Sequence, residues 1–198
     1  MGRSSREPSR GLSAVATVAG FAQGIEPMPS SVRTVIFSHG KESGPWGEKI
    51  TAMAAVVREL GGGVESVDYR GIDDPRARVA RLIEVGRGCA APIVLVGSSL
   101  GGHVSAAAAR ALGARGLFLL APAFYMPGFE DHTPRDCGCP AAIVHGWRDE
   151  IVPVDHSIRW AREHLAELHL LDSDHRLQDR IPAIGRLLRG FLESLDPG

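Results

Sequence analysis

The stretch Pro92–Gly102, PIVLVGSSLGG, decides the fold. Its apolar and mostly β-branched residues 93–96 predict a buried strand, and the alanine-rich segment Val104–Leu112 predicts a helix. A G-x-S-x-G pattern joins the two segments and has Ser99 at its apex. The flanking glycines leave room for a tight turn in which a Cβ atom would clash. We therefore expect a strand, a sharp turn and a helix. The hydroxyl of Ser99 would stand above the helix N-terminus, where backbone N–H groups can stabilise an oxyanion.

Strand and helix patterns alternate along the rest of the chain. Six short apolar runs, most of them apolar on both faces, predict a mostly parallel sheet of about six strands with helices on both faces. The sequence thus predicts an α/β three-layer sandwich. The other five strands are expected in Val32–Phe37, Val64–Tyr69, Leu117–Leu120, Ala141–His145 and Leu168–Leu171, and the other helices in Gly47–Leu60, residues 74–88, Asp155–Leu165 and Asp179–Leu195.

The length of 198 residues favours one folded domain, which we place at residues 32–198. We expect residues 1–31 to form a disordered N-terminal extension. Three arginines and the weakly apolar segment Leu12–Ala22 give this extension a faint likeness to an export signal. Because Gly, Ser, Thr and Gln dilute that segment, we expect a cytoplasmic protein, and export is the alternative.

Composition excludes several classes of partner and cofactor. The net charge of −1 offers no electrostatic surface for nucleic acid or an anionic membrane. No apolar run reaches the roughly 18 residues that a membrane span needs. Three cysteines cannot form a full disulfide framework, and the Cys137-Gly138-Cys139 spacing does not suit a metal site. The glycine-rich turn is neither a P-loop nor a dinucleotide-binding motif. We expect a small-molecule partner, no metal and no cofactor.

Several polar residues follow predicted strands. Ser99, His39, Asp149 and His175 each lie in the loop that follows a predicted strand, so all should lie at the carboxyl edge of the sheet. A serine hydroxyl is a poor nucleophile at neutral pH, and it needs a base within hydrogen-bond reach and a third group that orients the base. This edge supplies all three residue types.

The motifs around these residues resemble those of the α/β-hydrolase family. The segment His145–Pro153, HGWRDEIVP, is similar to the H-G-x-x-D-x-x-V-P segment that carries the acid of that family. Asp172–His175 resembles its terminal histidine turn, and Ser38–Gly40 resembles the turn that supplies part of its oxyanion hole. The resemblance extends from Val32 to Leu195 and implies a small esterase-like member.

The resemblance implies roles for individual residues. Ser99 is the expected nucleophile, His175 the general base and acid, and Asp149 the orienting carboxylate, with Glu150 as the competitor of Asp149. The backbone N–H groups of Leu100 and Lys41 are the expected oxyanion donors. The remaining histidines, including His39, His103 and His145, are expected to be structural or to have no role.

The substrate site is expected to be open and shallow. Many family members insert a helical lid after the strand equivalent to Leu117–Leu120, but here residues 124–140 leave room only for a loop. Arg70 is a candidate partner for a substrate carboxylate, and Gly40 is a further candidate substrate contact. Loop aromatic residues and a methionine either line an acyl pocket or only pack the loops; they are Trp46, Phe124, Tyr125, Met126, Phe129 and Trp147.

These features predict a serine hydrolase of small carboxylic esters or thioesters that works through an acyl-enzyme. A small-molecule binding or sensor protein on the same fold is one alternative, and an amidase or peptidase is another. The sequence leaves open the natural substrate, the role of the cysteines, and the choice between monomer and homodimer.

Overall fold

A computed structural model describes residues 33–127 and 132–195. The expectations for the N-terminal extension 1–31 and for Phe129 lie outside these residues.

The described chain contains one six-stranded sheet in which every paired strand is parallel. The strand order is β2-β1-β3-β4-β5-β6. The chain runs from β1 to the edge strand β2, crosses back past β1 to β3, and then adds β4, β5 and β6 in sequence toward the other edge. This confirms the predicted α/β fold with a largely parallel sheet. The strands are β1 Thr34–Ser38, β2 Gly63–Val67, β3 Ile93–Ser98, β4 Gly116–Leu120, β5 Ala141–Gly146 and β6 Glu167–Leu171.

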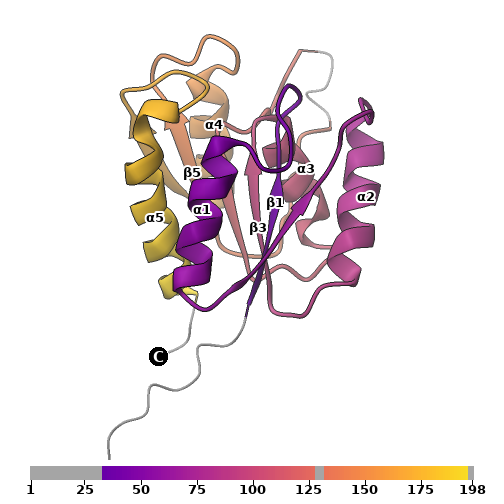
Figure 1. Cartoon of the computed structure of the whole chain (residues 1–198). Coiled ribbons are helices and arrows are strands. Elements are labelled where there is room, and N and C mark those ends of the chain that lie inside the picture. The colour runs from indigo at the N-terminus through magenta and orange to yellow at the C-terminus, as the bar shows by residue number, and fades with distance from the viewer. Residues whose placement is uncertain (1–32, 128–131, 196–198) are drawn as a thin grey trace, which may run out of the picture.

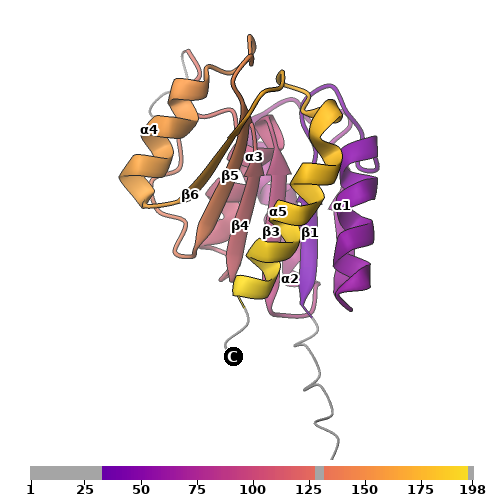
Figure 2. The ribbon, with the colours of Figure 1, turned by 90° about the vertical axis from the view of Figure 1, so that its left-hand side faces the viewer.

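Helices cover both faces of the sheet, which makes three layers. Figure 1 shows α1 and α5 side by side on one face, and α2 and α3 on the other. Figure 2 shows α4 beside β6, on the face opposite α5. The helices are α1 Glu48–Glu59, α2 Pro75–Arg87, α3 Leu100–Ala109, α4 Val154–His164 and α5 Ile181–Ser194, the last preceded by a short 3-10 turn, Gln178–Arg180.

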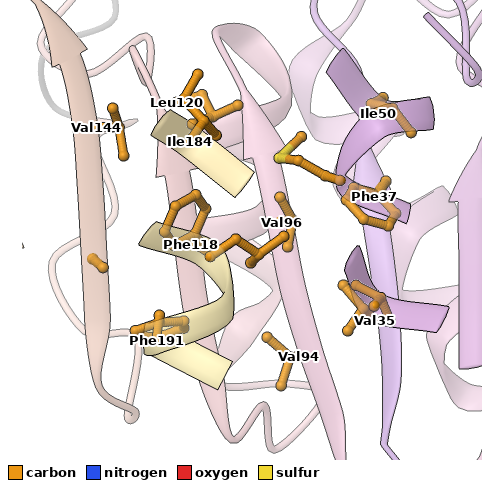
Figure 3. Close-up of a cluster of buried hydrophobic side chains, with 14 of the residues drawn as sticks. Val35, Phe37, Ile50, Val94, Val96, Phe118, Leu120, Val144, Ile184 and Phe191 are labelled. Carbon is orange, nitrogen blue, oxygen red and sulfur yellow. The ribbon is translucent and has the colours of Figure 1, made fainter. Parts of the chain in front are cut away.

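Alternating side chains of each central strand build two cores. In β3, Val94 and Val96 pack toward α1 and α5, whereas Ile93 and Leu95 pack toward α2, α3 and α4. Figure 3 shows the first core, in which Phe37 and Phe118 of the sheet lie among side chains of the two helices. Burial on both sides explains why these strands read as continuous apolar runs.

The connection from β4 to β5 is too short for a lid domain. Its described parts, residues 121–127 and 132–140, contain no α-helix. This agrees with the predicted fold without a lid domain. Within residues 33–127 and 132–195, no helix is long and apolar enough to cross a membrane.

Candidate active site

Ser99 occupies a strained turn between β3 and α3. Its φ of 55° and ψ of −121° are rare for a residue with a side chain. The helix begins at Leu100, earlier than the sequence predicted, so Ser99 alone separates β3 from α3. A Cβ atom on Gly97 would lie 2.3 Å from the carbonyl oxygen of Gly101. A Cβ atom on Gly101 would lie 2.1 Å from the carbonyl oxygen of Ser38, so both glycines are sterically required here.

Three side chains from separate strand ends form a chain of hydrogen bonds. The Nε2 atom of His175 lies 3.0 Å from the Oγ atom of Ser99. The Nδ1 atom of the same ring lies 2.7 Å from Oδ2 of Asp149. Because a carboxylate only accepts, Nδ1 carries the hydrogen and Nε2 is free to accept the hydroxyl proton of Ser99. Asp149 makes this contact, and its neighbour Glu150 is exposed.

The carboxylate of Asp149 is fully buried and fully hydrogen-bonded. Its Oδ1 accepts from the backbone N–H groups of Ile151, at 2.9 Å, and Val152, at 2.8 Å. Its Oδ2 accepts from His145 and His175. Burial by itself raises the pKa of this carboxyl group, but the four hydrogen bonds outweigh burial and hold the pKa of Asp149 well below its usual range.

His145 is a site residue that sequence reasoning assigned only to the strand end. Its ring is fully buried, and its Nε2 lies 2.9 Å from Oδ2 of Asp149 and 3.1 Å from the carbonyl oxygen of Val152. Both partners accept, so Nε2 carries a hydrogen, and Nδ1 can accept from the hydroxyl of Ser157 at 2.7 Å. The four-residue spacing between His145 and Asp149 was the available sequence signal.

Of the two predicted oxyanion donors, Leu100 directly follows Ser99, and Lys41 directly follows Gly40, which lies beside Ser99. Within the described residues, the N–H groups of Leu100 and Lys41 donate no hydrogen bond. Gly40 approaches the serine so closely that a Cβ atom built on it would lie 3.4 Å from Cβ of Ser99. His39 shapes this turn: its Nδ1 contacts the carbonyl oxygen of Gly40 at 2.7 Å, and its Nε2 accepts from the N–H of Tyr69 at 3.0 Å. Both of its nitrogens are therefore used structurally.

A pocket of about 730 Å³ opens above Ser99 and His175. Its volume suits a small organic molecule. The predicted residues Gly40, Lys41, Leu100 and Met126 also line it. Unpredicted lining residues include Lys49 of α1, His103 of α3, Ile151 and Val152 of the loop after β5, and Arg176 of the loop after β6.

The structure places the other substrate-binding candidates outside this pocket lining. Phe124 is buried and stacks on Trp160 on the α4 side of the sheet. Tyr125 donates its hydroxyl hydrogen to Glu163 at 2.6 Å. Their directions depend on α4, which the local sequence does not reveal.

The remaining three candidates lie at the surface. The guanidinium of Arg70 pairs with Asp68 at 2.6 Å. Trp46 is 50% exposed and lies under the guanidinium of Arg58, whereas Trp147 is 55% exposed. None of the three lines the pocket above Ser99.

Within residues 33–127 and 132–195, no three His, Cys, Asp or Glu side chains are placed to hold a metal ion. Cys89, Cys137 and Cys139 are free, and burial raises the pKa of each thiol. No thiol lines the pocket.

The fold and this edge of the sheet define an α/β hydrolase. The model of the alpha/beta hydrolase family matches residues 35–197, and the chain belongs to that family. No curated protein matches the sequence.

Solved structures agree with this assignment. An alpha/beta superfamily protein from Xanthomonas campestris pv. campestris, described as a candidate hydrolase, is 36% identical, with a TM-score of 0.76 over 81% of this chain and 97% of that chain. Est1E from Butyrivibrio proteoclasticus is 17% identical, with a TM-score of 0.69 over 82% and 87%. Mouse alpha/beta hydrolase domain-containing protein 10 is 22% identical, with a TM-score of 0.65 over 82% and 88%. The last two similarities concern the fold alone.

Proposed function

We propose that this α/β hydrolase cleaves small carboxylic esters or thioesters through an acyl-enzyme on Ser99. The observation that carries the proposal is the 3.0 Å contact between Nε2 of His175 and Oγ of Ser99, with Nδ1 held by the buried carboxylate of Asp149. This arrangement supports proton transfer from the serine as it attacks a carbonyl carbon.

The reaction proceeds in two halves. First, Oγ of Ser99 bonds to the carbonyl carbon while His175 takes the hydroxyl proton, and the developing oxyanion accepts from the N–H groups of Leu100 and Lys41. The bond to the leaving oxygen or sulfur then breaks, and His175 returns the proton to that atom. Water next attacks the acyl group, gives its proton to His175 and releases the acid, and Ser99 regains its hydrogen.

The proposal includes a cytoplasmic location and small-molecule substrates. It includes no nucleic-acid or membrane partner, and the protein is expected to be a monomer or a homodimer. The three free thiols fit a reducing compartment. The short connection between β4 and β5 favours small esters, because no lid domain encloses a long chain.

A fluorophosphonate probe tests this function directly. Intact mass and peptide mapping should find one adduct, on Ser99, in the wild type and none in Ser99→Ala. We expect p-nitrophenyl ester hydrolysis to fall by roughly 1,000-fold or more in that variant. A folded wild-type protein that takes no adduct and hydrolyses no ester would instead favour the binding-protein alternative. Parallel assays with acyl-thioesters and anilides separate ester, thioester and amide cleavage.

A further inference from the structure

Lys49 places a positive charge in the wall of the pocket. The residue lies on α1, and its Nζ donates to the hydroxyl of Ser98 at 3.2 Å. Ser98 directly precedes Ser99, and Lys49, Ser98 and Ser99 all line the same pocket. An anionic group of a bound molecule could therefore reach this ammonium while an ester carbonyl lies at the serine.

Within the described residues, the ammonium of Lys49 forms no ion pair. Its one hydrogen bond goes to the neutral hydroxyl of Ser98, which leaves donor capacity unused. Asp174 and Asp149 attract it from a distance, and Arg176 repels it. Burial removes part of the hydration of the Lys49 ammonium and lowers its pKa to about 8. A desolvated cation without a counter-ion, beside an open cavity, favours an anionic ligand.

The choice of lysine is unusual within this chain. Of its 22 lysines and arginines, only Lys41 and Lys49 are lysines, and both line the pocket. Lys41 is exposed, whereas Lys49 is half-buried. An ammonium is a compact point charge and a guanidinium is a planar fork, so the two cations are not equivalent at such a site.

The acidic residues of the lining do not neutralise Lys49. Glu42 and Glu48 are exposed, and Oε2 of Glu48 accepts from the side-chain amide of Gln178 at 3.3 Å. Lys41 and Arg176 add two further positive charges to the lining.

We propose that Lys49 binds a free carboxylate of the substrate, so that the preferred substrates are carboxylate-bearing esters or thioesters. This inference rests on the proposed function, and it moves the carboxylate partner from Arg70 to Lys49. The carboxylate belongs either to the acyl part or to the alcohol part of the ester.

Two matched substrate pairs test the proposal and separate these sources. Mono-p-nitrophenyl glutarate against p-nitrophenyl pentanoate places a carboxylate on the acyl side. The ion 4-acetoxybenzoate against its methyl ester places one on the alcohol side. For at least one pair, we expect wild-type kcat/KM to favour the anion by about 10- to 100-fold at pH 7, the effect of one charge-assisted hydrogen bond.

Variants at Lys49 supply the decisive comparison. Lys49→Met should abolish the preference, so that kcat/KM becomes similar for the two members of the pair, whereas Lys49→Arg should keep part of the preference. Absence of any anion preference in the wild type would overturn the proposal. Equal loss of both activities in a folded Lys49→Met protein would also overturn it, because the lysine would then serve only to hold Ser98.

Failure of the proposed function has a different signature. If neither member of a pair is hydrolysed and Ser99 takes no fluorophosphonate, the proposed function fails. Binding measurements then test the anion site at Lys49 independently of catalysis. Calorimetric titration of Ser99→Ala protein with monomethyl glutarate and dimethyl glutarate should still favour the acid, and the added Lys49→Met change should remove that difference. Equal binding of the two compounds would contradict the anion site.

Discussion

Asp149 accepts a hydrogen bond from His145 on the same carboxylate oxygen that faces His175. The Nε2–Oδ2 distance to His145 is 2.9 Å, and the Nδ1–Oδ2 distance to His175 is 2.7 Å. Because Oδ1 is held by two backbone N–H groups, the carboxylate is fixed in position and cannot rotate. These contacts predict that His145 is a positioning residue, which acts on the proposed base through Asp149.

Replacing His145 should impair this arrangement in a pH-dependent way. His145→Leu leaves Oδ2 of Asp149 and the hydroxyl of Ser157 short of a partner, at a cost of about 1–3 kcal/mol of stability. With one donor fewer, Asp149 carries more unshared charge, so the acid limb of the kcat/KM profile should move to higher pH. We expect kcat to fall about tenfold or more. His145→Gln, which can still donate, should restore part of the activity.

The control for this change is His169→Gln, because His169 pairs with Glu167 away from the pocket. Its pH profile should match that of the wild type. An unchanged profile in a folded His145→Leu protein would remove His145 from the proposed mechanism.

Gly146 is sterically required where the loop with His175 meets the end of β5. A Cβ atom there would lie 2.4 Å from the carbonyl oxygen of Ser173 and 2.6 Å from that of Asp174. Gly146→Ala should therefore push this loop away, lower stability by about 1–3 kcal/mol and reduce kcat. Gly190→Ala is the matched control, because a Cβ atom at Gly190 in α5 meets nothing within 4 Å.

Urea unfolding and ester assays distinguish the two glycine variants. Gly190→Ala should be neutral or slightly stabilising, as alanine favours helix. Equal stability and activity of the two variants would contradict the close approach of the loop to β5.

Asp149 links stability to pH. Its pKa lies below the usual range in the folded protein, so the ionised form contributes stability above the ordinary carboxyl pKa, and this contribution is lost as pH falls toward the folded-state pKa. Asp149→Asn should lower stability by about 3–5 kcal/mol at pH 7, and the difference from wild type should shrink below about pH 4.

Activity of the same variant should fall by roughly 1,000-fold or more. Glu150→Gln is the matched control, because Glu150 is exposed and should affect neither quantity. A larger loss of activity in Glu150→Gln than in Asp149→Asn would reverse the assignment of the orienting acid.

The preference for anionic substrates should depend on pH. Burial lowers the pKa of Lys49 to about 8, against the attraction of Asp174 and Asp149 and with the repulsion of Arg176. The ammonium is charged below that pH and neutral above it. The ratio of kcat/KM for mono-p-nitrophenyl glutarate to that for p-nitrophenyl pentanoate should therefore fall as pH rises from 7 to 9. A ratio that stays constant over this range would assign the preference to another cation.

Much of the fold could be predicted because local patterns and tertiary structure agree. Apolar runs of strand length, burial on both faces and helical spacing placed the six strands and five helices close to their observed bounds. The main difference is at α3, which begins directly after Ser99. Helix propensity alone does not reveal that Ser99 is the single residue between β3 and α3.

The sequence by itself determined the order of Ser99, Asp149 and His175 and their common edge, because parallel strands bring their carboxyl ends together. Only the tertiary structure decided which other side chains reach the pocket. Phe124 and Tyr125 turn toward α4, whereas Lys49 enters from α1 and His145 reaches Asp149 from the end of β5. The physical reason is that the strand and helix pattern determines the position of each residue along the backbone. Packing against elements distant in the sequence determines the direction of its side chain and how far that side chain is buried.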